Sequence, residues 1–206
     1  MTVAGIKIGV EERAVSRAVC AALLALITVL AYLPAARGGF VWDDAIYITG
    51  NPLVKAGDGL YRFWFTTEAF DYYPLTWSVW WMEWRIWGER PLGYHVVSIV
   101  LHVANALLLW AILRRLSIPG SWLAATLFAI HPVNVATVGW ISEQKNTLSM
   151  LFSALAIWFY LSFKQDGRRV WYALSLSSFV LALFSKSAVV MLPVVLLGLG
   201  CIETRS

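Results

Sequence analysis

Two adjacent carboxylates close the motif Phe40-Val41-Trp42-Asp43-Asp44, which follows a long apolar segment by only a few residues. A carboxylate near the membrane surface can serve as a general base toward a hydroxyl group or as a metal ligand. In the alternative interpretation, Asp43 caps a short helix and Asp44 faces solvent. Asp43 and Asp44 are therefore candidate catalytic residues. The cofactor stays open, with a divalent metal held by this pair as the candidate.

Four further polar side chains are candidate substrate-binding residues. They are His131, which precedes Pro132, then Glu143 and Lys145 in one short polar stretch, and Lys186 in a later turn. Two lysines and a histidine beside an acidic pair could hold a phosphate while a base activates an acceptor. Alternatively, the lysines extend toward lipid headgroups and His131 bonds to a neighbouring helix. Their convergence on one side favours a substrate-binding role.

The elements that position these residues are apolar. Of the 206 residues, 60% are hydrophobic and 14% are charged, against about 45–50% and 25% in soluble domains. Spanning a bilayer as a helix takes roughly 20 apolar residues. The sequence therefore predicts an all-α protein, a polytopic transmembrane helical bundle in one domain over residues 1–206. About six membrane helices are expected, at residues 14–33, 93–113, 121–139, 147–163, 170–184 and 188–202.

The first apolar segment, residues 14–33, is longer than the roughly 7–15 residues of a signal-peptide core, so we interpret it as an uncleaved helix. Basic residues in short loops stay on the cytoplasmic side. This rule puts both termini and two basic clusters inside, and the long loop of residues 36–92 outside. The clusters are Arg114 with Arg115, and Lys164, Arg168 and Arg169. The basic residues form no continuous stripe, so no nucleic-acid partner is expected.

Five tryptophans of the outer loop recur at spacings of three and four, namely Trp77, Trp80, Trp81, Trp84 and Trp87. They share one broad helical face, and tryptophan prefers the headgroup level. We therefore expect an interfacial helix that contacts membrane lipid, with Glu83 facing water or headgroups. The helix would dock the loop, or it would receive a lipid-linked substrate.

Two polar residues inside the second apolar segment, His102 and Asn105, are spaced by three and share a helical face. We expect them to form hydrogen bonds between helices rather than to bind a ligand. The sequence has no Gly-rich phosphate loop, no nucleophile elbow and no paired zinc motif.

An ordered set of short motifs resembles the membrane part of the TMTC-type protein O-mannosyltransferases and their bacterial relatives, in the GT-C group of membrane glycosyltransferases. Besides the acidic motif, the set comprises Asn51-Pro52, Tyr73-Pro74-Leu75-Thr76, Gly93-Tyr94-His95, Leu101-His102-Val103-Ala104-Asn105-Ala106-Leu107-Leu108, His131-Pro132-Val133, Ser142-Glu143-Gln144-Lys145-Asn146 and Phe184-Ser185-Lys186. The resemblance implies transfer of a sugar from a polyprenyl-phosphate donor to a protein or glycan acceptor on the outer face. A bacterial plasma membrane is the location it implies.

The resemblance also implies residue roles. One carboxylate of the acidic pair would be the base or would assist a metal, and Lys186 would contact the donor phosphate. The chain departs from the family pattern around Glu143, and Ser187 replaces the glutamate that follows Lys186 in the family.

Relatives have about twice as many membrane helices, so the chain is expected to be the N-terminal half of a longer enzyme, a truncated reading frame or a small inactive homologue. The alternative function is a non-catalytic scaffold whose tryptophan-rich loop binds lipid or another subunit. A transporter is disfavoured because the ionisable groups lie at one surface, not at the midplane.

Overall fold

The chain is helical, as the computed structural model shows for the backbone of residues 3–203 and the side chains of residues 16–198. No strand occurs within residues 3–203, which confirms the all-helical prediction. The helices of the apolar segments are α1 (Val3–Tyr32), α5 (Pro91–Arg115), α6 (Ser121–Ile130), α8 (Gln144–Asp166), α9 (Arg169–Ser185) and α10 (Leu192–Glu203). Residues 38–90, here called the cap, contain α2 (Pro52–Lys55), α3 (Gly59–Phe65) and α4 (Pro74–Trp87).

Among the residues that the structure describes, three segments are long and apolar enough to cross a membrane, and they are Ser16–Arg37, Pro91–Arg115 and Ile141–Asp166. The chain is therefore an integral membrane protein. Three other apolar helices are shorter, namely Ser121–Ile130, Arg169–Ser185 and Ser187–Gly198. The count of six crossings stays a prediction.

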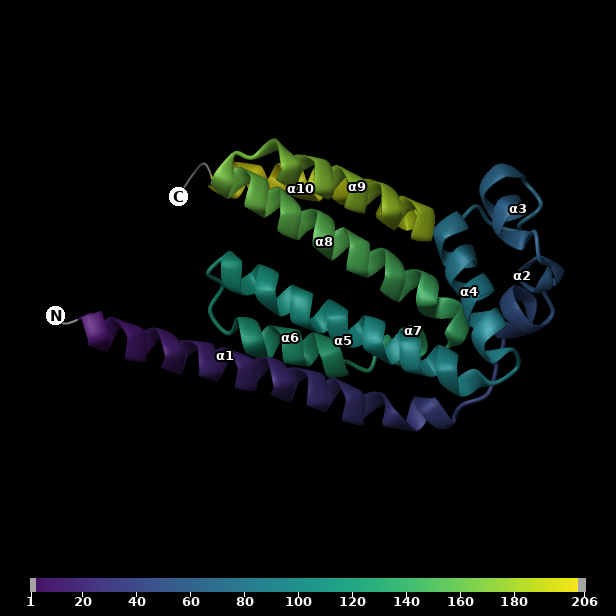
Figure 1. Ribbon diagram of the computed structural model, residues 1–206, viewed down its shortest axis with the longest axis horizontal. Helices are drawn as coiled ribbons and strands as arrows, with labels where there is room; N and C mark the ends of the chain where they lie inside the picture. Colours follow the sequence, from purple (N-terminus) through teal and green to yellow (C-terminus); the bar gives the residue numbers. More distant parts are fainter. Residues whose placement is uncertain (1–2, 204–206) are drawn as a thin grey trace.

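The long helices lie side by side, and the cap lies at one end of them (Figure 1). In the chain, α8 packs against α9 and α5, and α5 packs against α6 and α1. The chain reverses sharply after α8 at Gly167, whose φ of 66° is left-handed and suits glycine. The end of α1, the start of α8 and the end of α9 all lie at the cap end of the bundle (Figure 1).

The apolar segment of residues 121–139 is interrupted, which corrects the prediction of one helix there. Helix α6 ends at Ile130, and the short α7 (Asn134–Gly139) begins after the turn. His131 is extended, with φ −64° and ψ 132°, because the ring of the following Pro132 disfavours helical geometry in the residue before it. The last segment is also divided, since a 3₁₀ turn, Ser187–Met191, precedes α10.

Polar side chains join the helices where the sequence predicts. Asn105 donates through Nδ2 to the carbonyl of Thr147 on α8 at 2.8 Å. The Nε2 atom of His102 lies 2.9 Å from the carbonyl oxygen of Ala129 on α6. Both bonds are buried, so the interhelical interpretation of His102 and Asn105 is confirmed.

An aromatic core holds the cap together. Trp77 and Trp80 of α4 are buried, and Phe63 of α3 stacks on Trp77 with ring centroids 5.2 Å apart. The hydroxyl of Thr76 donates to the carbonyl of Ser185 at 2.9 Å, which fastens the cap to the end of α9. These contacts support the docking role of α4. Its position in the membrane interface stays a prediction, and the two central tryptophans contact protein.

Candidate functional site

Three of the predicted site residues form one hydrogen-bonded network at the cap end of the helices. Lys145 Nζ lies 3.3 Å from Glu143 Oε1. The side-chain nitrogen Nδ2 of Asn146 donates to Glu143 Oε2, and Lys186 Nζ donates to the side-chain oxygen Oδ1 of Asn146. The network therefore brings the start of α8 and the end of α9 together. With two ammonium groups and one carboxylate, it is suited to an anionic ligand. Asn146, its central link, was not among the predicted site residues.

Tyr47 connects this network to the cap. Lys145 Nζ lies 4.7 Å from the centroid of the Tyr47 ring, a cation–π distance. The Tyr47 hydroxyl donates to Asp71 Oδ2 at 2.9 Å. Burial raises the pKa of Tyr47, and the charges of Asp71 and Asp43 raise it further. The phenol therefore stays protonated, and the charge of Asp43 acts on a ring that Lys145 also contacts.

The two carboxylates of the acidic pair have different surroundings. Asp44 is buried, and its Oδ1 and Oδ2 accept the backbone N–H groups of Ser142 at 2.7 Å and Val41 at 2.9 Å. Asp43 is exposed. The alternative with a capping Asp43 and an exposed Asp44 is therefore wrong, because Asp44 ties the start of the cap to the turn before α8. Only Asp43 offers an accessible carboxylate.

A metal ion does not fit the acidic pair well. The backbone N–H groups occupy both oxygens of Asp44, so this pair offers one free carboxylate. Within residues 16–198, no three His, Cys, Asp or Glu side chains gather at metal-binding distance.

His131 lies apart from the network. Its side chain is exposed, and its Nδ1 accepts the backbone N–H of Val133 at 3.2 Å, within its own turn. Among the described side chains, no hydrogen bond or ion pair joins His131 to Glu143, Lys145 or Lys186. The structure thus gives His131 a role in the turn between α6 and α7. Its predicted substrate contact stays a prediction.

A cleft of about 360 Å³ opens beside Tyr47 in the cap. Its lining includes Tyr47, Asn51 and Phe70, with the ion pair of Arg62 and Glu68 among the lining residues. Phe70 is 81% exposed and meets Tyr47 edge-on. The Tyr47 ring lines the cleft and also contacts Lys145, which is not itself a lining residue.

Glu83 is buried, and the prediction that it faces water or headgroups is wrong. It is only 4% exposed, whereas water or headgroups were expected around it. Gln144 donates to Glu83 Oε1 at 2.9 Å, and burial raises the pKa of Glu83 to about 8, outweighing this hydrogen bond. The signal was present in the sequence: Glu83 follows Trp80 by three residues and precedes Trp87 by four, so it lies on the tryptophan face.

Comparisons with known proteins agree with the motif resemblance. The sequence profile of the family described as dolichyl-phosphate-mannose-protein mannosyltransferase matches residues 74–204. This range contains the network and Glu83, and it begins after the acidic pair.

Individual relatives carry the same activity in their names. Protein O-mannosyl-transferase F38B6.6 of Caenorhabditis elegans is 29% identical over 150 residues, covering 66% of this chain and 22% of the relative. Protein O-mannosyl-transferase TMTC1 of Mus musculus is 32% identical over 174 residues, covering 74% of this chain and 18% of the relative. Protein O-mannosyl-transferase Tmtc1 of Drosophila melanogaster is 30% identical over 159 residues, covering 71% of this chain and 18% of the relative. The chain thus spans about a fifth of these relatives. No solved structure matches it.

Proposed function

Because the chain belongs to the dolichyl-phosphate-mannose-protein mannosyltransferase family, we propose that it is a membrane glycosyltransferase or the N-terminal part of one. It transfers a sugar from a polyprenyl-phosphate donor to an acceptor hydroxyl on the outer face. The observation that carries this proposal is the network of Glu143, Lys145, Asn146 and Lys186. It offers two cations for a phosphate next to a cap that carries Asp43.

The proposed reaction uses Asp43 as the general base. Its carboxylate takes the proton of the acceptor hydroxyl while the acceptor oxygen bonds to the anomeric carbon of the sugar. The bond from that carbon to the phosphate oxygen breaks, and polyprenyl phosphate leaves with the electron pair. Lys186 and Lys145 stabilise the negative charge that develops on this leaving group. The cleft beside Tyr47 gives the acceptor room.

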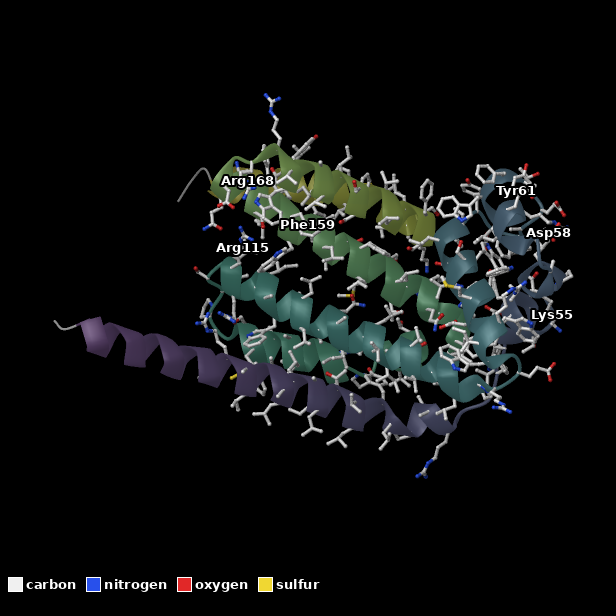
Figure 2. The ribbon with its side chains drawn as sticks, in the orientation of Figure 1. Lys55, Asp58, Tyr61, Arg115, Phe159 and Arg168 are labelled. Carbon is white, nitrogen blue, oxygen red and sulfur yellow. The ribbon has the colours of Figure 1, made fainter. Side chains whose placement is uncertain are left out.

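We further propose that the chain crosses a bacterial plasma membrane six times as one domain, with the N-terminus cytoplasmic and residues 36–92 outside. The distribution of charge supports this orientation. Arg115 and Arg168 lie at the end of the bundle opposite Lys55 and Asp58 of the cap (Figure 2). Arginines in short loops favour the cytoplasmic side.

Transfer of a labelled sugar from a polyprenyl-phosphate donor in membranes tests this function. Asp43→Asn is expected to lower the rate by roughly 10²-fold or more, because the amide cannot accept the proton. Asp58→Asn is the matched control, since Asp58 is another exposed acid of the cap, and it should transfer like the parent. Equal transfer by Asp43→Asn would remove the proposed base. Absence of transfer in the parent would favour the non-catalytic scaffold.

A further inference from the structure

Behind the network, a buried carboxyl group meets a buried amide. Glu83 of α4 is 4% exposed, and Gln144, the first residue of α8, is 1% exposed. Gln144 Nε2 donates to Glu83 Oε1 at 2.9 Å and lies 3.2 Å from the carbonyl oxygen of Tyr94. The second oxygen of each side chain, Glu83 Oε2 and Gln144 Oε1, is buried without a hydrogen-bond partner.

No cation compensates Glu83 among residues 16–198, where it forms no ion pair. The nearby ionisable groups are engaged elsewhere. The Tyr94 hydroxyl of α5 donates to a backbone carbonyl of the cap, Lys145 pairs with Glu143, and Arg85 of α4 donates to backbone carbonyls. Burying an unpaired carboxylate is costly, and such a group binds a proton instead.

A single proton on Glu83 would give both of these oxygens a hydrogen bond. A proton bound to Glu83 Oε2 would turn this oxygen from an acceptor into a donor. The acceptor for its hydrogen bond would be Gln144 Oε1. A carboxylic acid and a primary amide would then share two antiparallel hydrogen bonds in one ring. Both atoms are buried without a hydrogen-bond partner, as the two ends of such a bond would be in the absence of the proton.

We propose that Glu83 is a neutral carboxylic acid that forms a two-bond ring with Gln144, and that it is a positioning residue for the first turn of α8. Gln144 is flanked by Glu143 and Lys145, and Asn146 follows in the same turn. The ring therefore fixes the backbone that carries three of the four network residues. This inference concerns how the network is held and does not depend on what the chain transfers.

The ring should respond to pH. Burial raises the pKa of Glu83 to about 8, so the acid is neutral at neutral pH. Above that pKa the proton is lost, and with it the bond to Gln144 Oε1. Glutamine at position 83 keeps both bonds, because its amide group donates and accepts as the neutral acid does.

Infrared difference spectroscopy in detergent micelles tests the protonation directly. At about pH 7, the parent minus Glu83→Gln spectrum is expected to show the carbonyl stretch of a protonated carboxylic acid, and this stretch should vanish with a midpoint near pH 8. Glu89→Gln is the matched control, an exposed glutamate just after α4, and it should remove only carboxylate stretches. Carboxylate stretches in the Glu83 difference spectrum would overturn the proposal.

The positioning role has its own test, the rate at which an acylating reagent modifies Lys145, read by mass spectrometry. Glu83→Leu removes both hydrogen bonds, so the first turn of α8 opens more often and labelling rises about tenfold or more. Glu83→Gln should label like the parent. Gln144→Leu breaks the same ring from the other side and serves if Glu83→Leu does not fold. Parent-like labelling in the folded leucine variant would overturn the positioning role, whether or not sugar transfer is detected.

Discussion

The pH dependence of stability offers a quantitative test of the buried Glu83. The perturbation is Glu83→Gln, which removes the ionisation and keeps the shape and hydrogen-bonding pattern of the neutral acid. In the unfolded chain the carboxyl group ionises near its ordinary pKa of 4.5, and in the folded chain near 8. The folded state therefore holds the proton more tightly, and the stability of the parent falls as the pH rises between these two values.

The magnitude follows from the same two values. Each pH unit above 4.5 lowers the free energy of unfolding by about 1.4 kcal/mol until the pH reaches about 8. The loss is roughly 3 kcal/mol at pH 7 and roughly 5 kcal/mol at pH 8 and above. Glu83→Gln escapes this loss, so it should match the parent below about pH 4.5 and exceed its stability at neutral pH.

Thermal unfolding in detergent micelles across this pH range measures the effect. At about 2–4 °C per kcal/mol for a chain of this size, the Tm of Glu83→Gln should exceed that of the parent by roughly 6–12 °C at pH 7. Glu89→Gln, on the exposed surface, should follow the parent within about 0.5 kcal/mol throughout. Parallel Tm curves for Glu83→Gln and the parent would refute the argument, because they would mean that Glu83 ionises alike in both states.

Three further predictions concern the network and the helix contacts. Asp44→Asn should lower the free energy of unfolding by about 1–3 kcal/mol in the same thermal assay, since an amide offers one acceptor oxygen to two buried N–H groups; Asp43→Asn should change it by less than about 0.5 kcal/mol. Asn146→Leu removes the partner of Lys186 and should raise the KM for the lipid-linked donor about tenfold, as donor titration would show; an unchanged KM would separate Lys186 from donor binding. Asn105→Leu should cost about 1 kcal/mol in reversible unfolding in mixed micelles, and no change would mean that the α8 carbonyl finds another partner.

Hydropathy could predict the helices because the backbone N–H and C=O groups of a long apolar stretch must form their hydrogen bonds within that stretch inside a bilayer. The turn at Pro132 was also predictable, since proline constrains the residue before it. The residues at which each helix begins and ends were harder to predict. Helix α10 starts at Leu192, after a 3₁₀ turn. Pro193 favours a helix start at this point, whereas hydropathy placed the start of the apolar segment at residue 188.

The candidate site was predictable only in part. Glu143, Lys145 and Lys186 share one end of the bundle because the helices alternate in direction, and the sequence shows that alternation. Asp44 is buried where it accepts a hydrogen bond from the backbone of Ser142, 98 residues away, and the local sequence pattern contains no information about such a contact. The burial of Glu83 did have a local signal, because its position in the helix places it on the tryptophan face. The negative charge of a glutamate favours exposure, and the prediction followed the charge.

The hydrogen bond from Thr76 to Ser185 joins residues 109 positions apart and constrains the order of assembly in the cell. During synthesis the cap emerges well before α9 reaches the translocon, so its docking surface has no counterpart for that interval. Non-local contacts of this kind form late. The surface of the cap that contacts α9, which includes the ring of Trp64 against Phe184, is thus open to chaperones and proteases until α9 is inserted, and quality control can act at this step.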